Sequence, residues 1–578
     1  MLGAAFLCRC KIFSDLPRWI LFFLAFGLWP VFFSWTGFIG LYRIPHIAEC
    51  MGAAFALYFI AKYYSRRSNI RRWLIESTHY NAIALGIIFL ITQLLVQHCY
   101  FTGGVNNWPD DQVRGLSFTS AFAANYLKPA HPIDLSIPLS YGYYLFEYTA
   151  FLYSAVDGYS WPSITLLIAS IISIAIFYFA FLKLLRIFLP APQKPGTELF
   201  ALMAVTFYGF DIFVYPEAPL VHHIEWWNPV QITQMASYWN WVYHYLASAA
   251  LSMTGLVCLH DALTQKRRDL LITSAAFMCL GPTFAPTTGI FFILVGMLTL
   301  TLSLATQYRT DIPRWFFHNT LALSPTILFL MIAILLPQLF TFWGREEYLH
   351  LLKTPVLWFS RTPVASASMA QWITFGVVLI AELGTVLFIG LLATPFYIWK
   401  MRKFFPFATL TALSLLIVII LSEFSTEAQT NDWYWRSGGF GIILLCPIIA
   451  TWLFTRWMPD GKPKRTIYWL FMLLLFAPCA FNFYSELRFR YDSCNEPAPF
   501  LADINRNTDL HTAISRTPFD SGLVYFAGRI AVMPGNSAKE FLSIYSLSNP
   551  FLKQWFGYNG EMRPCKSTWY GSSTPNCD

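Results

Sequence analysis

The segment LLITSAAFMCLGPTFAPTTGIFFILVGML (residues 270–298) is apolar along its length except for GPTFAPTTG at its centre. Two proline and two glycine residues at this point cannot sit inside one straight helix. We therefore predict two helices, one rising toward the outer side of a membrane and one returning, joined by a turn in the outer leaflet. Irregular backbone at that depth is tolerated where protein or a watery cavity surrounds it, so the turn should line such a place.

The composition of the whole chain is that of a membrane protein. Of the 578 residues, 56% are hydrophobic and 12% are charged, whereas soluble globular proteins carry about 25% charged residues. The net charge of +8 comes from lysine and arginine in short loops, where such residues set membrane orientation. No nucleic-acid partner is therefore expected, and no Walker-type or GxGxxG motif points to a nucleotide cofactor.

The apolar segments predict an all-α polytopic membrane protein with about thirteen transmembrane helices. The predicted segments are 17–40, 45–63, 81–101, 161–187, 198–214, 237–260, 270–283, 286–306, 317–342, 371–398, 404–422, 437–455 and 466–484. If the amino terminus is inside, all the basic clusters between these segments fall on the cytoplasmic side. The sequence thus predicts a multi-pass protein of the cytoplasmic (inner) membrane, with a cytoplasmic amino terminus and an extracytoplasmic carboxyl terminus.

Two regions follow from this topology. Residues 1–485 form the transmembrane domain, and residues 486–578 form a small extracytoplasmic C-terminal region, expected to pack on the membrane part or to depend on a disulfide. Cys494, Cys565 and Cys577 lie in that region, and an oxidising compartment favours one disulfide among them, with the pairing left open. The long extracytoplasmic loops are predicted at 102–160, 215–236, 343–370 and 422–438.

An acidic pair, Asp110 and Asp111, stands in the first of these loops, in GGVNNWPDDQVRGLSF (residues 103–118). Carboxylates just beyond a membrane span are costly unless they face water, which makes the pair a candidate functional site. One of them can act as a general base or as a metal ligand. The alternative is that Pro109-Asp110-Asp111 begins a helix, where carboxylates are favoured as caps.

A second group of polar residues, His222, His223 and Glu225, lies in the loop at 215–236. Three such side chains can ligate a metal, although zinc ligands are usually spaced along a regular scaffold. They can equally contact substrate hydroxyls, or simply form a solvated loop. All three interpretations stay open, and so does the identity of any divalent metal.

A histidine, His244, lies in SYWNWVYHYLAS at the outer end of a predicted span, near Trp239 and Trp241. A histidine at such an interface is usually a hydrogen-bonded packing residue, and the tryptophans can form an interfacial belt. The aromatic residues of the outer loops also suit stacking against sugar rings. A carboxylate inside a predicted span, Glu382, is either functional or buried between helices.

An arginine, Arg436, follows NDWYW and precedes an apolar span. Arginine binds phosphate in a bidentate manner and stays charged, and a lipid phosphate would lie at this depth. The alternatives are that Arg436 pairs with Asp432, four residues earlier, or extends toward the interface. Arg436 and Asp432 are therefore candidate substrate-binding residues.

Taken in chain order, these elements resemble the C-type (GT-C) integral-membrane glycosyltransferases over residues 17–485. Members carry an acidic residue in the first outside loop, as NNWPDDQVR does, followed by amphipathic segments such as YGYYLFEYTAFLY. WNWVYHYLAS matches the Trp and His of a W-x-P-x-H motif, although it lacks the proline, and GPTFAPTTG matches a helix pair broken by a Pro/Thr/Gly turn. NDWYWR fits an N-D-x-x-x-R element that opens a late span, which assigns Asn431, Asp432 and Arg436.

The resemblance implies an inverting enzyme that moves a sugar from a polyprenyl-phosphate-linked donor to an acceptor glycan, lipid or protein of the cell envelope. Asp111, or else Asp110, would be the catalytic base, and Arg436 would hold the lipid phosphate. No cofactor is certain, and a divalent metal remains open. The alternative functions are a transporter or flippase for lipid-linked or envelope substrates, and a non-catalytic envelope assembly factor.

Overall fold

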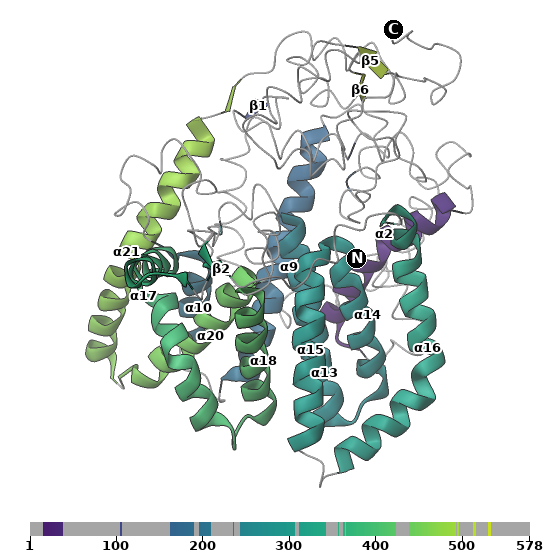
Figure 1. Cartoon of the computed structure of the whole chain (residues 1–578), viewed down its shortest axis with the longest axis horizontal. Coiled ribbons are helices and arrows are strands. Elements are labelled where there is room, and N and C mark those ends of the chain that lie inside the picture. The colour runs from purple at the N-terminus through teal and green to yellow at the C-terminus, as the bar shows by residue number, and fades with distance from the viewer. Residues whose placement is uncertain are drawn as a thin grey trace.

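In the part of the chain that the structure describes, the protein is a bundle of long helices with a few very short strands in the connections (Figure 1). The computed structural model describes residues 16–38, 105–106, 119, 149, 162–189, 196–209, 235, 243–306, 311–342, 356–357, 362–363, 366–423, 438–459, 461–492, 494–495, 513–515 and 530–532. Its helices are α2 (Arg18–Phe38), α9 (Pro162–Phe188), α10 (Thr197–Thr206), α13 (Tyr243–Gln265), α14 (Arg268–Phe284), α15 (Pro286–Thr306), α16 (Asp311–Phe342), α17 (Met369–Met401), α18 (Pro406–Glu423), α20 (Gly439–Trp457) and α21 (Lys462–Asp492).

The predicted spans correspond closely to these helices. Each predicted segment that falls within the described residues contains a helix, and seven helices are long and apolar enough to cross a membrane by length and composition. A multi-pass membrane protein is thereby supported. The predicted segments 45–63 and 81–101 lie outside the described residues, so the total of about thirteen stays a prediction.

The largest difference concerns the segment predicted at 198–214. Its helix, α10, ends at Thr206, because Phe207 is extended and Gly209 adopts a left-handed φ of 76°. Apolar composition alone does not show such an end, since the residues beyond it are also mostly apolar.

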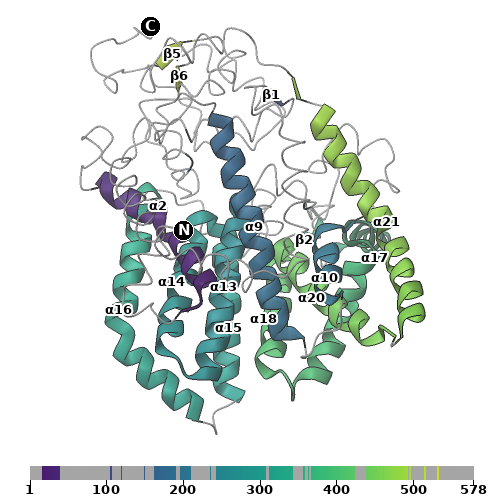
Figure 2. The ribbon, with the colours of Figure 1, turned by 180° about the vertical axis from the view of Figure 1, so that it is seen from behind.

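The helices form two neighbouring groups (Figures 1 and 2). In one group, α13 packs against α9, α14 and α15, with α2 and α16 alongside α14. In the other, α20 packs against α10, α17 and α18, and α21 borders α17. Helices α15 and α18 join the groups, and the Tyr397 hydroxyl of α17 donates a hydrogen bond to the Phe188 carbonyl at the end of α9, at 2.9 Å.

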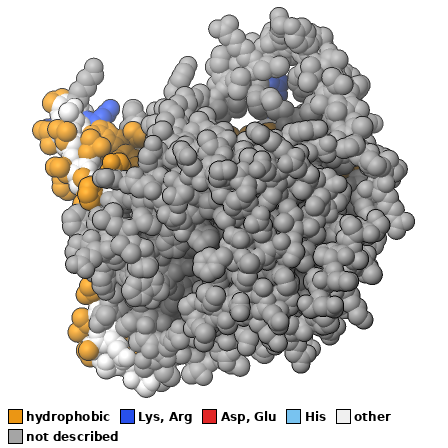
Figure 3. Space-filling model, turned by 90° about the horizontal axis from the view of Figure 1, so that it is seen from above, with side chains coloured by type: hydrophobic (Ala, Val, Ile, Leu, Met, Phe, Trp, Pro, Cys, Tyr) orange, Lys and Arg blue, Asp and Glu red, His pale blue; other side chains and the backbone are white. Residues whose placement is uncertain are grey.

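Burial separates central helices from peripheral ones. Most of the side chains of α13 and α20 are buried, whereas α16 and α21 expose large apolar side chains such as Leu321, Phe329 and Leu474. Hydrophobic side chains also project at the margin of the molecule seen from above (Figure 3). An outward apolar surface of this kind fits contact with lipid chains rather than with water.

The two ends of the bundle differ in character. The connections α13–α14, α17–α18 and α20–α21, which carry basic clusters, lie at the lower end in Figure 1. At the opposite end, β1 (Val105–Asn106) pairs antiparallel with β4 (Cys494–Asn495). This pairing brings part of the loop predicted at 102–160 beside the start of the C-terminal region. Which end faces the cytoplasm stays a prediction.

Other strands are equally short. β2 (Val356–Leu357) pairs antiparallel with β3 (Thr362–Pro363), just before α17, and β5 (Ala513–Ser515) pairs parallel with β6 (Ile530–Val532) in the C-terminal region. These pairs were not predicted, because two or three residues carry no readable alternation. The predicted disulfide cannot be followed here, since the side chains of Cys494, Cys565 and Cys577 lie outside the described residues.

Helix α17 is interrupted at Gly384, whose φ of 61° and ψ of 176° are not helical. A Cβ atom there would lie 2.8 Å from the nitrogen of Gly209 and 3.2 Å from the sulfur of Cys479. The kink therefore needs glycine both for its backbone conformation and for the close approach of two other segments. The interruption was not predicted, because a glycine within a mostly apolar predicted span does not by itself indicate a kink.

We expect Gly384→Ala to lower the free energy of unfolding by about 1–3 kcal/mol, because it forces an alanine into a glycine-only backbone region. Gly376→Ala is the matched control in the same helix, since a Cβ atom there meets nothing within 4 Å. The control should be neutral or stabilising by up to about 1 kcal/mol. Thermal unfolding of the purified protein in detergent measures both, and equal effects of the two variants would contradict this account of the kink.

Candidate functional site

Among the site residues predicted from the sequence, His244 is the one that the structure describes. It lies in the first turn of α13 and is buried. The centroid of its ring is 4.2 Å from that of Tyr245, and it meets the Tyr243 ring edge-on with the centroids 6.2 Å apart. This aromatic packing fits the interpretation of His244 as a packing residue. A contact with substrate is not tested by it. The other predicted site residues, Asp110, Asp111, His222, His223, Glu225, Asp432 and Arg436, lie outside the described residues, as does the side chain of Glu382.

The predicted break in residues 270–298 is present. Helix α14 ends at Phe284, Ala285 is extended with φ −151° and ψ 106°, and α15 begins at Pro286. The two helices form a tight hairpin, because a Cβ atom on Gly289 would lie 2.1 Å from the nitrogen of Pro282. Glycine at this position allows the two half-helices to touch backbone to backbone.

The broken hairpin is braced by α13. The Ser248 hydroxyl donates a hydrogen bond to the Gly281 carbonyl at 2.8 Å and lies 3.3 Å from the Ala285 carbonyl. The same two carbonyls also accept backbone hydrogen bonds, Gly281 from the Ala285 N–H at 3.2 Å and Ala285 from the Gly289 N–H at 2.9 Å. Ser248 therefore adds a hydrogen bond between helices at the break, and the break is buried against protein, as the sequence led us to expect.

A line of polar side chains follows one face of α13. His244, Ser248 and Ser252 are spaced four residues apart, so they lie above one another on the helix. The Ser252 oxygen would lie 2.2 Å from a Cβ atom on Gly281 and has no hydrogen-bond partner in the described part of the chain. His244 thus stands one turn beyond the braced break, at the end of α13 opposite the basic α13–α14 connection.

A third element, the start of α20, adjoins this place. Phe440 contacts Tyr245 of α13 at 6.4 Å between ring centroids and Phe177 of α9 at 6.5 Å. Gly441 also lies close to α15, because a Cβ atom there would be 2.6 Å from the Phe291 ring. The first turns of α13 and α20 and the upper part of α15 therefore pack together. Phe440 follows Arg436 by four residues in the sequence, and the NDWYWR segment itself lies outside the described residues.

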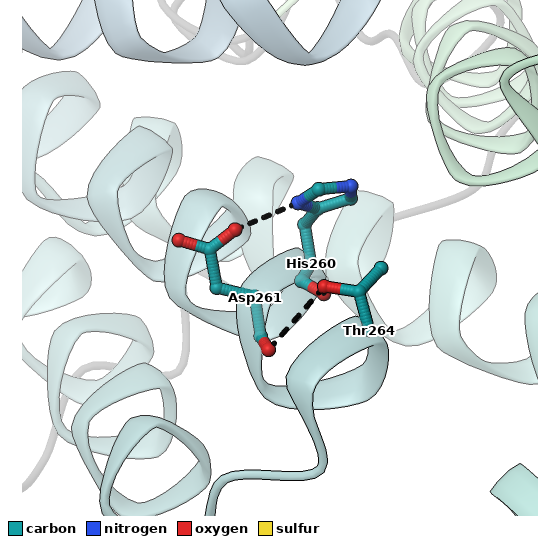
Figure 4. Close-up of polar contacts among 3 residues, drawn as sticks. All are labelled: His260, Asp261 and Thr264. Carbon is teal, nitrogen blue, oxygen red and sulfur yellow. Dashed lines mark hydrogen bonds and ion pairs between the residues drawn. The ribbon is translucent and has the colours of Figure 1, made fainter.

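A second polar cluster lies at the other end of α13 (Figure 4). The Nδ1 atom of His260 is 2.9 Å from the Asp261 carboxylate, and the Thr264 hydroxyl donates to the His260 carbonyl at 2.9 Å. The threonine points at backbone oxygens rather than at the imidazole, so the three residues do not form a nucleophile–base pair. His260 also packs edge-on against Phe407 of α18 at 5.1 Å. We interpret this cluster as the polar end of a helix.

Ion pairs occupy the same end. Arg186 of α9 pairs with Glu198 of α10 at 2.8 Å, and Arg267 pairs with Asp269 across the α13–α14 connection. Within the described residues, no group of three or more His, Cys, Asp or Glu side chains is arranged to hold a metal. The loop with His222, His223 and Glu225 is not covered by that statement.

The brace can be tested by Ser248→Ala. Removing an interhelical hydrogen bond within a membrane bundle should lower stability by about 0.6–1.7 kcal/mol. Thr254→Val is the control on the same helix, because the Thr254 hydroxyl donates to Ala250 of its own helix at 2.8 Å. Chemical or thermal unfolding in detergent should place the control near the unmodified protein, and an equal loss in both variants would show that Ser248 does not brace the break.

Comparison with models of protein families and with curated proteins finds no match. Among solved structures, the chain is similar to arabinosyltransferase EmbB from Mycobacterium smegmatis, determined by single-particle cryo-EM, with 11% identity and a TM-score of 0.36. The similarity covers 73% of this chain and 41% of that one, so this chain spans less than half of the length of the matched protein. A likeness at this level carries no argument about activity.

Proposed function

We propose that the chain is a membrane glycosyltransferase that moves a sugar from a polyprenyl-phosphate-linked donor to an acceptor of the cell envelope, outside the cytoplasmic membrane. One observation supports this most directly. The turn of His244, the broken α14–α15 hairpin and the start of α20 adjoin one another, although they are far apart in the sequence. The first two carry motifs on which the resemblance to the C-type glycosyltransferases rests, and the third directly follows the NDWYWR motif in the sequence.

The first outside loop can reach the same end of the bundle. Strand β1 ends at Asn106, four residues before Asp110, and it pairs with β4, which follows the outer end of α21. Within the same loop, the hydroxyls of Thr119 and Thr149 lie 2.9 Å apart and are buried. Described contacts thus lie on both sides of Asp110 and Asp111 in the sequence, and the proposal is that the segment between them reaches the end of the bundle that holds His244.

The chemistry needs one base and one phosphate clamp. In an inverting displacement, a carboxylate takes the proton of the acceptor hydroxyl as that oxygen bonds to the sugar carbon, while the bond from the sugar carbon to the lipid-phosphate oxygen breaks. A cationic side chain that neutralises the departing phosphate lowers the barrier. We assign the first role to Asp111, with Asp110 beside it, and the second to Arg436, with Asp432, His244, His222, His223 and Glu225 as candidate substrate contacts.

The catalytic base is tested by Asp111→Asn, which keeps the shape of the side chain and removes its basicity. We expect turnover to fall by about 10²–10⁴-fold, with expression and donor binding unchanged, because a general base contributes on that scale. Transfer is measured in proteoliposomes supplied with polyprenyl-phosphate-linked sugars carrying a radioactive label.

Asp110→Asn is the matched variant for this experiment. If only Asp110→Asn lowers turnover, the base is the neighbouring carboxylate. If neither substitution changes turnover, the pair is a helix cap, and the glycosyltransferase proposal loses its catalytic base.

The phosphate clamp is tested by Arg436→Ala and Arg436→Lys. The alanine variant should lose nearly all activity and bind donor weakly, whereas lysine should retain part of both, since it keeps the charge without the bidentate geometry. Arg456→Ala, at the opposite end of α20 beside Trp452, removes the same charge away from the proposed site. Unchanged donor affinity in Arg436→Ala would exclude the role, and a transporter would instead show donor movement without transfer.

A further inference from the structure

The first half of α17 does not run with the other helices. In Figures 1 and 2 it is seen end-on, whereas the helices around it run up the picture. The change of direction occurs at the Gly384 kink, and Leu383–Met401 is by itself long and apolar enough to span a membrane. Residues 369–383 therefore form a separate half-helix at the upper end of the bundle.

The second half of α17 is by itself nearly long enough to cross the hydrocarbon core of a membrane, so the first half cannot lie in the same core as a continuation of it. Leu383–Met401 has 19 residues, which at about 1.5 Å per residue cover roughly 28 Å. The hydrocarbon core of a bilayer is about 30 Å thick. The kink thus falls close to the boundary of the core, and residues before it must either leave the membrane or turn along its surface.

The exposed residues of the half-helix favour a position along the membrane surface. Met369, Ile373, Val377 and Ile380 are 76%, 61%, 54% and 38% exposed, and their spacing of four, four and three residues places them on one side of the helix. Trp372 is exposed beside them. Glu382, beside the kink, is the one charged residue in the sequence of 369–383. A stripe of this kind would be unfavourable in water, and an interfacial helix buries such a stripe among the acyl chains.

Both ends of the half-helix are defined by specific contacts. At its start, the Ser368 side chain accepts a hydrogen bond from the Gln371 backbone N–H, and the Gln371 side chain accepts one from the Ser368 N–H, at 2.8 Å. Such a capping box fixes where a helix begins. At its other end, the kink packs against Gly209 and Cys479, and Phe207 meets Phe483 of α21 at 5.1 Å. The change of direction at Gly384 is therefore held by contacts among three chain segments: α17, the residues that follow α10, and α21.

We propose that residues 369–383 form an interfacial helix that lies in the plane of the membrane, in the leaflet at the end of the bundle opposite the basic connections. The partner of its exposed stripe is the boundary between the headgroups and acyl chains of that leaflet, and Trp372 stands at headgroup level, where tryptophan is favoured. This proposal is independent of the glycosyltransferase proposal, and neither fails with the other.

The test measures depth at two positions of the half-helix. A fluorescent amino acid replaces Met369 or Ile380 in the full-length protein, which is then reconstituted with phosphatidylcholine brominated at defined acyl carbons. These positions are 11 residues apart, so they differ in depth by about 16 Å if the helix spans and hardly at all if it lies flat. We expect equal depths for both, with the strongest quenching by bromine near the carbonyl end of the chain.

The matched control is a pair on α21, Leu473 and Tyr484, which are also 11 residues apart and exposed at 53% and 56%. Leu473 lies near the middle of the span Pro463–Phe481 and Tyr484 beyond its end, so their depths should differ by about 16 Å. A difference of that size between Met369 and Ile380 would overturn the proposal. Absence of quenching at both would also overturn it, since protein, such as a second copy of the chain, would then cover the stripe.

Discussion

The requirement that buried backbone groups be hydrogen-bonded within the membrane controls this structure most clearly at Ala285. The chain stops being helical there, yet the Ala285 N–H still bonds to the Gly281 carbonyl and the Ala285 carbonyl accepts from the Gly289 N–H, as an apolar region without water requires. Ser248 adds a hydrogen bond from the neighbouring helix, while Gly281 and Gly289 let α14 and α15 approach closely enough to remain buried. The hydrogen bond from Ser248 therefore fixes where α13 lies along the α14–α15 hairpin, and the helices that pack on α13 depend on that placement.

The same placement of α13 brings the segments of the candidate site together. Because Ser248 faces the hairpin, His244, one turn earlier, lies beyond the break at the end of α13. Tyr245 then meets Phe440, which joins the start of α20 to this place. Both α13 and α20 are largely buried, so their first turns have little freedom to move independently. A binding site built from such turns would be held by packing as much as by its polar residues.

At the edge of the bundle, glycine also determines the path of a helix. The second half of α17 runs along the bundle, and the helix changes direction where Gly384 and Gly209 approach each other. At this kink glycine lets two chain segments approach closely, whereas in the α14–α15 hairpin it lets the facing sides of two helices come into contact. In both places the absence of a side chain determines the path of the backbone. The exposed apolar residues around the corner follow from that path rather than from any local signal.

The sequence by itself determined that the chain is a helical membrane protein, where most of its described helices lie, and that residues 270–298 are broken by GPTFAPTTG. These properties depend on apolar length and on proline and glycine chemistry, which act locally and can be read from neighbouring residues. The same patterns indicated His244 and the NDWYWR segment as separate candidates, and they predict that the acidic pair lies in an outside loop.

Only the tertiary structure decided which of these segments meet. Ser248 gave no sign in the sequence that its hydroxyl would brace Gly281, 33 residues later, and Tyr245 gave none that it would contact Phe440. The kink at Gly384 and the early end of α10 depend on each other, because Gly209 and Gly384 touch. Contacts of this kind join residues distant in the chain, and their energy depends on how whole helices pack, which no local pattern of residue types records.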